Sequence, residues 1–374
     1  DVIRFWVSEF DIDGIRLDAA DVLDFNFMHA LRRTADEVKE DFWLMGEVIH
    51  GDYSRWVNGD TLHSVTNYAL HKALYSGHND HNYFEIAHTV KYLQNMGDLD
   101  LYNFVDNHDV ERIYTKLSNK AHFEPIHILL YTLPGIPSIY YGSEFGIEGK
   151  KEKFSDASLR PALDLENYKN AVTENPCTAL IAALGKIRQA TPALSYGNYN
   201  ELMLTNRQYA FARDLDDVRV IVTVNNDDNA TGMNLPAGNT AIYIGALSGE
   251  RAEVQGGRIN VTIPANSGDI WIPEEQMKEE SPVPVAIMKK VKPVTVKEQK
   301  PSENETIVCE EKKEPETDLK TDWSKTPDEM TVKELQAAIL EKMAGNGPVT
   351  DQMKKTVIDN IWHDSLVNWL KSFH

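Results

Sequence analysis

The feature that most constrains the fold is a series of short apolar runs that each lead into an acid. Residues 14–18 and 43–47 are strand-like runs closed by Asp18 and Glu47, and Asp109 comes shortly after another such run. Acids at the ends of successive strands are typical of parallel sheets, because ligand sites gather at the carboxyl ends of parallel strands. A strand-end acid taken alone is more often a helix cap or a surface charge.

The intervals between these acids predict how the strands are connected. Asp18 and Glu47 lie about one strand–helix repeat apart. Between them, apolar residues recur at spacings of three and four, as in an amphipathic helix: Phe27, Leu31, Ala35 and Val38. Glu47 and Asp109 lie about two repeats apart, which requires an intervening strand. The predicted strands beyond Glu47 are residues 63–67, 102–106 and 137–141.

Strands that alternate with helices predict right-handed crossovers and a parallel α/β sheet. Such a sheet can close into a (β/α)₈ barrel or stay open and doubly wound. Both place their ligands at the strand carboxyl ends, so periodicity alone leaves the two arrangements open.

From about Tyr199 the pattern changes to strands without helices. Residues 209–213, 218–224 and 258–263 alternate in polarity or are β-branched, and Asn-, Asp- and Gly-rich turns separate them. This pattern predicts an antiparallel β domain that ends near Ile272.

The last hundred residues differ in composition from the rest. Residues 274–328 are rich in Lys, Glu and Pro and lack glycine, which predicts a disordered linker that cannot bury a core. Residues 329–374 predict a module of two helices. Thr331 and Glu334 form a capping-box pattern for the first helix, and the second helix follows Thr350. The two helices are expected to pack on each other or on the main body, and a docking module is the alternative.

The formal charge of −20 argues against nucleic acid as a partner, because phosphates attract Lys and Arg patches. No run of 18 apolar residues predicts a membrane span. Cys177 and Cys309 lie far apart in unlike segments, which predicts two unpaired thiols and no cysteine-based metal site. The chain opens at Asp1 inside a helix-like stretch, so the natural N-terminus is expected to be missing. Localisation stays open, with the cytoplasm favoured over secretion.

Three motifs occur together and in order: Asp-Gly-Ile-Arg-Leu-Asp-Ala at residues 13–19, Gly-Glu-Val at 46–48 and Phe-Val-Asp-Asn-His-Asp at 104–109. Together they resemble glycoside hydrolase family 13, the α-amylase family, over roughly residues 1–272. The resemblance implies an α/β fold made of the C-terminal part of a (β/α)₈ TIM barrel, strands four to eight, at residues 1–195. An antiparallel β-sandwich C domain at 196–273 and the helical tail follow.

The resemblance also assigns roles to the three acids. Asp18 is expected to be the nucleophile, Glu47 the general acid and base, and Asp109 the residue that stabilises the distorted sugar and the transition state. A retaining glycosidase places its nucleophile and its acid about 5 Å apart, on either side of the anomeric carbon. Arg16 lies two positions from Asp18 on the same strand face and is expected to keep Asp18 ionised, while a less polar site keeps Glu47 protonated.

Four further residues are expected to bind the sugar. Asn107 and His108 adjoin Asp109, and His108 resembles the family histidine that hydrogen-bonds sugar hydroxyls. His50 is a candidate for the aglycone side. Arg160 resembles an Arg-Pro segment that borders the cleft in relatives, with a surface loop as the alternative. Core packing is the default expectation for the aromatic residues near these motifs, and stacking on glucose rings is the alternative: Trp56, Tyr140 and Tyr141.

Residues 46–52, with Trp56 and the pair Asn67-Tyr68, are similar to the cyclomaltodextrinase, neopullulanase and maltogenic-amylase branch. That resemblance implies an α-glucan substrate: cyclodextrins, pullulan, starch or short maltodextrins, cleaved at α-1,4 and also α-1,6 bonds. Residues 19–22 lack the Lys-His pair that accompanies calcium in many α-amylases, so neither a metal nor another cofactor is predicted. The resemblance still allows calcium and a homodimer in the full-length enzyme.

The first three strands of the family's barrel, its B domain and an N-terminal β domain have no counterpart in these residues. A five-stranded part of a barrel leaves two unpaired edges, so the isolated chain is expected to be poorly active or inactive. Other functions remain open. The same acids serve α-glucan transglycosylases and sucrose isomerases, and a silent homologue used for binding or assembly is a further alternative. So is a generic α/β protein whose acids cap helices.

Overall fold

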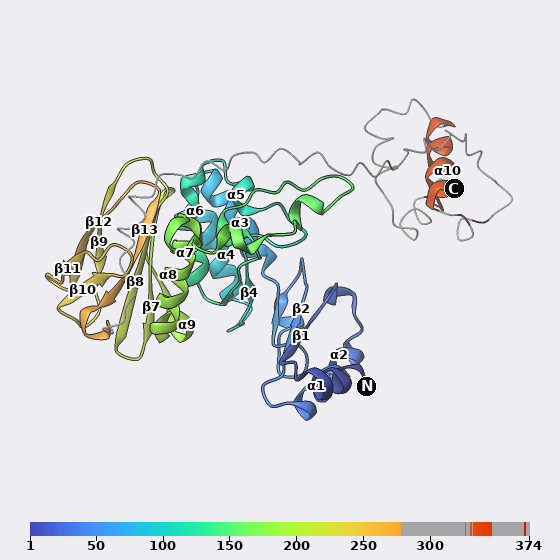
Figure 1. Cartoon of the computed structure of the whole chain (residues 1–374), viewed down its shortest axis with the longest axis horizontal. Helices are drawn as coiled ribbons and strands as arrows, with labels where there is room; N and C mark the ends of the chain where they lie inside the picture. Colours follow the sequence, from blue (N-terminus) through green and yellow to red (C-terminus); the bar gives the residue numbers. More distant parts are fainter. Residues whose placement is uncertain (278–325, 327–329, 331, 346–369, 372–374) are drawn as a thin grey trace. The chain divides into compact units, whose positions relative to one another are not determined.

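The computed structural model describes these residues: 1–277, 326, 330, 332–345 and 370–371 (Figure 1). The chain divides into two compact units, residues 1–296 and 297–374. In the second unit, helix α10 (Val332–Gly345) buries Leu335 and Ile339. Thr331, most of the expected linker and the expected helix after Thr350 lie outside the described residues. No helix in the described parts is long and apolar enough to cross a membrane.

Five short strands of the first unit follow one another as parallel neighbours. β1 (Gly14–Leu17) pairs with β2 (Trp43–Gly46), and β2 pairs with β3 (Ser64–Val65). A single parallel bridge links the residue after β3 to the start of β4 (Tyr102–Asn103), and β4 pairs with β5 (Ile136–Pro137). The order of these strands in space is therefore their order in the chain, as in consecutive units of a (β/α)₈ barrel.

Each strand is shorter than its sequence pattern predicted. The run at residues 102–106 pairs only over Tyr102–Asn103, and the run at 137–141 contributes only Pro137, because the chain turns away after it. The residues that leave the ladder are those that carry the polar side chains, so early strand termination places them at the carboxyl edge of the sheet.

Helices connect the strands and continue beyond them. Their bounds are α1 (Val2–Phe10), α2 (Phe25–Val38), α3 (Tyr68–Asn79), α4 (Tyr83–Gln94), α5 (Ile113–Lys116), α6 (Phe123–Thr132), α7 (Ala171–Glu174), α8 (Pro176–Ala190) and α9 (Pro192–Tyr196). Side-chain caps begin three of them, because Asp24, Asn67 and Asn175 each accept a backbone N–H from the first turn.

Helix α2 forms where the apolar spacing predicted it, and Leu31, Ala35 and Val38 face the core as expected, whereas Phe27 does not. Phe27 is half exposed, and Met28 is buried with Leu31 and Ala35. Asp24 caps the helix by accepting the N–H of Phe27, and Met28, in place of Phe27, packs into the apolar cluster around β2.

We expect Met28→Ala to lower the free energy of unfolding by about 2–5 kcal/mol, because truncation of a fully buried side chain leaves a cavity. Phe27→Ala is the matched control on the same helix and is expected to cost about 1 kcal/mol, since half of the ring is already in water. Urea unfolding of both variants measures the difference. Equal losses would contradict the observed orientation of α2.

The C-terminal part of the first unit contains only β-strands. Their bounds are β6 (Asn198–Leu204), β7 (Gln208–Leu215), β8 (Val218–Asn225), β9 (Thr231–Pro236), β10 (Ile242–Gly245), β11 (Arg251–Glu253), β12 (Arg258–Ile263) and β13 (Ser267–Pro273). Six of them form an antiparallel sheet in the order β11-β10-β13-β8-β7-β6, and β12 pairs with β9 in a second sheet. Side chains of the two sheets share a core, with Trp271 and Ile221 facing Leu235 and Ile259.

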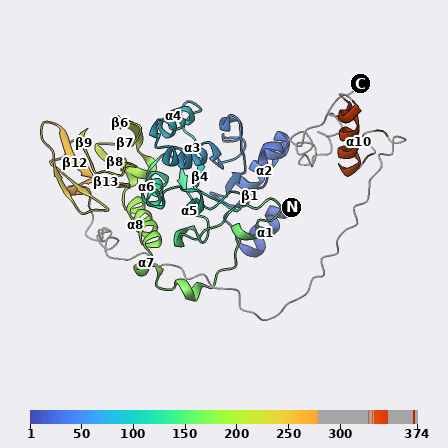
Figure 2. The same cartoon turned by 90° about the horizontal axis from the view of Figure 1, so that it is seen from above.

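The opposite face of the six-stranded sheet packs on helices of the parallel part. Phe211 and Val222 share a continuous core with Ile128 of α6 and Leu184 of α8. Figures 1 and 2 both show α6 and α8 alongside β7 and β8. A separate apolar cluster fills the space around β1, β2 and α2.

Candidate active site

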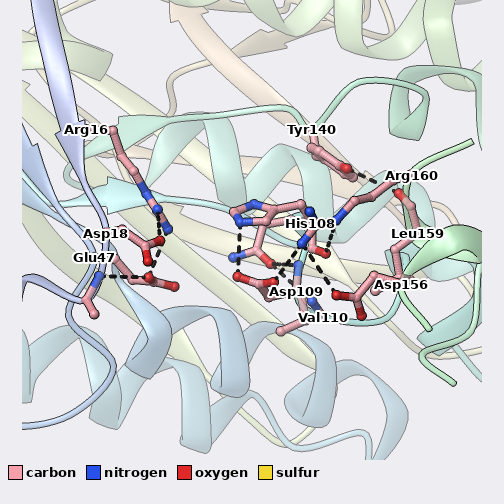
Figure 3. A network of polar contacts seen from close by, with 12 residues as sticks. Arg16, Asp18, Glu47, His108, Asp109, Val110, Tyr140, Asp156, Leu159 and Arg160 are labelled. Atoms are coloured by element: carbon pink, nitrogen blue, oxygen red, sulfur yellow. Dashed lines mark hydrogen bonds and ion pairs between the residues drawn. The ribbon is translucent and has the colours of Figure 1, made fainter. Parts of the chain in front are cut away.

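Arg16, Asp18 and Glu47 come together at the carboxyl ends of β1 and β2 (Figure 3). The Arg16 guanidinium contacts both acids, with Nη1 on Asp18 and Nη2 at 2.9 Å from Oε2 of Glu47. Parallel pairing sets this geometry, because Leu17 lies opposite Gly46 and the next residue of each strand is the acid. Asp18 is 82% exposed, whereas Glu47 is only 12% exposed.

The surroundings of Glu47 differ from the sequence prediction of a less polar site. Arg16 reaches Glu47 as well as Asp18, so one cation lies against both carboxylates. The backbone N–H of Ala19 also points at Oε2 of Glu47, at 3.3 Å. Ala19 has φ 42° and ψ 48°, a left-handed conformation that costs a non-glycine residue about 1 kcal/mol or more. The bend after Asp18 thus turns a backbone donor toward Glu47.

Tyr68 connects the first two acids to the third. Its hydroxyl lies 3.2 Å from Oε1 of Glu47 and accepts the side-chain amide of Asn107 at 3.1 Å. The Asn107 carbonyl oxygen in turn accepts the backbone N–H of Asp109 at 2.8 Å. Burial, with a smaller effect of the nearby Glu47 charge, raises the pKa of Tyr68 to about 12. The hydroxyl therefore keeps its proton and donates a hydrogen bond to Glu47.

Asp109 is held from the other side by an arginine and a histidine ring. Arg160 Nη2 lies 3.2 Å from Oδ1 of Asp109, and the ring of His108 lies 3.0 Å from Oδ2. Asp156 shares the same Arg160 at 3.5 Å, and Lys151 donates to the backbone carbonyl of Asp109. Figure 3 shows this group facing the Arg16 group. The loop that carries Arg160 therefore closes onto the segment after β4.

The structure brings seven of the eight residues predicted for the site into one connected set of contacts: Arg16, Asp18, Glu47, Asn107, His108, Asp109 and Arg160. His50 is solvent-exposed after β2 and makes no hydrogen bond or ion pair with these seven residues. Trp56 is buried, and its ring is stacked near Phe25. Tyr140 lies near the His108 ring, and Tyr141 donates to a backbone carbonyl.

Sequence reasoning missed Tyr68, Asp156 and Lys151 as site residues. Tyr68 had a signal in the sequence, because it is the first residue of a helix that begins directly after a predicted strand, with Asn67 as its cap. Asp156 also had one, because it lies four positions before Arg160 on a short turn, the spacing at which an acid and an arginine meet. Lys151 had no signal, since its contact to Asp109 depends on how the loop after β5 folds.

In the gene product that contains this chain, we expect Tyr68→Phe to reduce turnover about tenfold while lowering stability by no more than about 1 kcal/mol. The substitution removes the hydrogen bond to Glu47 and the one accepted from Asn107, and it leaves the ring contact with Phe104 intact. Steady-state kinetics and urea unfolding of the same preparation measure the two effects. Tyr75→Phe on the same helix is the control. A Tyr68→Phe variant with unchanged turnover would remove Tyr68 from the site.

Among residues 1–277 and the described part of the tail, no group of three or more His, Cys, Asp or Glu side chains is arranged to hold a metal ion. Residues 19–22, where the calcium-associated pair of many α-amylases would lie, form a short 3₁₀ turn (Ala20–Val22). Cys177 is a free thiol whose pKa burial raises to about 11, and Cys309 lies outside the described residues.

Comparison with known proteins identifies the family to which the chain belongs. A family model described as "Alpha amylase, catalytic domain" matches residues 1–193, more than half of the chain. The chain belongs to the α-amylase family. The resemblance carried by its three motifs is thereby confirmed, and the generic α/β alternative is set aside.

Curated relatives in this family have related names. The chain is 31% identical over 234 residues to a cyclomaltodextrinase of Thermoanaerobacter pseudethanolicus, covering 60% of this chain and 39% of that protein. It is 28% identical over 281 residues to neopullulanase 2 of Thermoactinomyces vulgaris, covering 72% of this chain and 46% of that protein. The chain thus spans less than half the length of these curated relatives.

Solved structures of the α-amylase family share the fold. An α-amylase from Anoxybacillus matches with a TM-score of 0.65 and 22% identity, over 73% of this chain and 62% of that one. A debranching enzyme from Nostoc punctiforme matches with a TM-score of 0.63 and 26% identity, over 72% of this chain and 60% of that one. These likenesses support the TIM-barrel fold of the family, of which this chain covers a part.

Proposed function

We propose that this chain carries the catalytic acids of a retaining glycoside hydrolase that cleaves α-glucosidic bonds of maltodextrins, cyclodextrins, pullulan or starch. The observation that carries the proposal is the sharing of Arg16 between Asp18 and Glu47. One guanidinium that contacts both carboxylates holds them on the same side of the sheet edge, as a double-displacement reaction needs for its nucleophile and its acid. The contact path through Tyr68 and Asn107 brings Asp109 to the same site.

In the proposed reaction, an Asp18 oxygen attacks the anomeric carbon while the glycosidic C–O bond breaks. Glu47 gives its proton to the departing oxygen, so the leaving sugar departs as an alcohol. Water then attacks the same carbon, Glu47 takes one of its protons, and the bond to Asp18 breaks. Asp109, held by Arg160 and His108, is positioned to bind sugar hydroxyls and to stabilise positive charge on the ring.

We further propose that residues 1–195 are strands four to eight of the (β/α)₈ barrel, and that 196–273 form its β-sandwich C domain. Support comes from five parallel strands in chain order and from two face-to-face antiparallel sheets. The division into a linker at 274–328 and a two-helix module at 329–374 stays a prediction, as does a homodimer of the longer enzyme.

The 374-residue chain by itself is expected to be poorly active. Asp18 is 82% exposed, whereas a glycosidase nucleophile needs a site from which water is excluded. Helix α1 has no fully buried residue and exposes Phe5, Trp6 and Phe10, so an apolar face of this helix is left uncovered. Hydrolysis of β-cyclodextrin by the purified chain measures this. Turnover in the usual enzyme range of about 1–10³ s⁻¹ would contradict the prediction.

The substrate is tested by a product profile of the gene product that contains this chain, on β-cyclodextrin, pullulan and starch. The names of the curated relatives support cyclodextrin and pullulan as substrates. We expect cyclodextrin opening and pullulan cleavage to exceed starch hydrolysis, with retention of the α-anomer in the first product. Products of inverted configuration would contradict the double displacement, and no cleavage of any of the three would contradict the function.

Transglycosylation is the second candidate, since a cyclomaltodextrin glucanotransferase of Bacillus is 26% identical over 271 residues. Both reactions share the covalent intermediate and differ in whether water or a sugar hydroxyl attacks it. Addition of glucose or maltose as acceptor separates them. Coupling products in place of free reducing ends would favour the transferase.

A further inference from the structure

Behind the candidate active site, a single buried guanidinium joins three segments of the chain. Arg112 is fully buried and lies three residues after Asp109. Its Nη1 donates to the carbonyl oxygen of Tyr141 at 2.6 Å and to Ser143 Oγ at 3.0 Å, and its Nη2 donates to the carbonyl oxygen of Leu159 at 2.8 Å. The segment after β4 is thereby joined to two parts of the long loop after β5.

The other end of the segment after β4 is fixed through the same serine. Ser143 Oγ donates to Asp106, with Oδ2 at 2.8 Å, and Asp106 accepts the backbone N–H of Ile113 at 2.7 Å. Asp106 is buried, which raises its pKa to about 6. Both ends of residues 106–113, and with them Asp109 between the ends, are therefore attached to one position on the loop after β5.

The loop after β5 packs tightly against the Arg112 side chain. A Cβ atom at Gly142 would lie 3.2 Å from Nη1 of Arg112, and one at Gly149 would lie 2.8 Å from its Cγ. The ring of Tyr140 covers the guanidinium, with its centroid 4.4 Å away, and the same ring lies 6.4 Å from the His108 ring. The Arg112 side chain is thus enclosed by the backbone of the loop after β5 and by the Tyr140 ring.

We propose that Arg112 is a positioning residue that sets Asp109 and His108 on one segment against Arg160 on the other. Arg160 directly follows Leu159, whose carbonyl Arg112 holds, and Asp109 lies on the segment from which Arg112 extends. Lysine cannot replace it, because one ammonium cannot reach the three acceptors that the planar fork reaches. The proposal rests on the proposed function, since it assigns Arg112 an effect on the reaction through Asp109 and Arg160.

Hydrogen exchange tests the clamp without reference to activity. In Arg112→Lys, amides of residues 106–113, 140–149 and 157–161 are expected to exchange at least about tenfold faster, with the β domain unchanged. Arg213→Lys is the matched control. Arg213 is also buried and holds three backbone contacts, to Thr132 and Gly197, away from the site. Unchanged exchange in the three loop segments of Arg112→Lys would overturn the proposal.

Kinetics of the gene product that contains this chain test the effect on the reaction. For Arg112→Lys we expect kcat on maltotriose to fall on the order of 100-fold with a smaller change in KM, because Asp109 is misplaced in the transition state. Arg213→Lys lowers stability without this kcat loss. In Arg112→Ala, added guanidinium restores part of kcat and methylammonium does not. Equal kcat losses in both lysine variants, or no rescue by guanidinium, would overturn the positioning role.

The two arms keep the proposals separate. A wild-type gene product that cleaves no α-glucan removes the proposed function, while the exchange pattern still decides whether Arg112 clamps the loops. An active wild type whose Arg112→Lys variant keeps full kcat removes the inference and leaves the function in place.

Discussion

Replacement of Asp18 by Asn in the gene product that contains this chain is expected to reduce kcat/KM on maltotriose by at least about four orders of magnitude. The amide is a poor nucleophile, so the covalent intermediate does not form. The same loss is expected with an aryl maltoside whose phenol leaves readily, because the missing step is the attack itself. Steady-state rates on the two substrates measure the effect.

Glu47→Gln is expected to behave differently on the same two substrates. Loss of the general acid costs about 10²–10⁴-fold on maltotriose, whose leaving group needs a proton. The aryl maltoside needs no such proton, so its first step stays fast. The covalent intermediate then accumulates, because the amide of this variant cannot accept a proton from the attacking water. A burst of released phenol followed by slow turnover is the expected signature.

Asp13→Asn is the matched control for both variants. Asp13 lies just before the other end of β1, is highly exposed and pairs with Lys39, so it changes from carboxylate to amide without reaching the site. Its activity is expected to equal that of the wild type. If Asp18→Asn were as active as Asp13→Asn, the chain would be a binding or assembly homologue. If Glu47→Gln lost equal activity on both substrates, Glu47 would not be the acid.

The local parts of the fold could be predicted because they depend on nearby residues. Apolar runs that end in Asp18 and Glu47 indicated strand positions to within a few residues, since a buried parallel strand needs a continuous apolar run. The place of α2 was predictable for the same reason. Its first buried position was not, because Phe27 and Met28 are both apolar and only the packing against the β2 cluster decides which of them faces the core.

The candidate site could be predicted where one motif carried its residues, and not where separate loops meet. Asp109 and His108 are neighbours in the sequence, so their side chains were expected to lie close together. The contact of Lys151 with Asp109, and the junction of Tyr141 and Leu159 at Arg112, depend on the path of a long irregular loop. Hydrophobic periodicity contains no information on such a path.

The reach of Arg16 shows the same limit on a smaller scale. Residue spacing places Arg16 on the face of β1 that carries Asp18, which is the contact that was expected. Whether it also meets Glu47 depends on the register between β1 and β2, and this register puts Leu17 opposite Gly46. Pairing register is a property of two strands together and cannot be derived from either one alone.

A mildly acidic solution is expected to destabilise the first unit strongly, because four histidines are buried in it: His71, His78, His122 and His127. Burial lowers the pKa of His71 to about 4, the pKa of His78 to about 3 and the pKa of His127 to about 4. In the unfolded chain each titrates near 6.5, so below that pH the unfolded state binds more protons. The free energy of unfolding is therefore highest above about pH 6.5, where the histidines are neutral in both states, and it decreases as the pH falls below that value.

At pH about 5 His71, His78 and His127 are each expected to cost about 2 kcal/mol, since one pKa unit corresponds to about 1.4 kcal/mol. Asp106 acts in the opposite direction. Its pKa of about 6 lets the folded state take a proton that the unfolded state takes only near 3.8, which returns on the order of 1 kcal/mol at pH about 5. The expected net loss between neutral pH and about pH 5 is about 4–5 kcal/mol, a large part of the roughly 5–15 kcal/mol typical of a domain.

Urea unfolding at about pH 7, 6 and 5 measures this loss, and one substitution assigns it. His127 is buried on α6 and its ring lies against that of Phe123, with centroids 3.9 Å apart, so His127→Phe keeps an apolar ring in that place. The variant is expected to lose about 2 kcal/mol less than the wild type over this pH range. His88→Gln, at an exposed position on α4, is expected to retain the full slope. If the wild type unfolded at the same urea concentration at both ends of the range, the histidines would have to be charged in the folded state, and solvent would have to reach their rings.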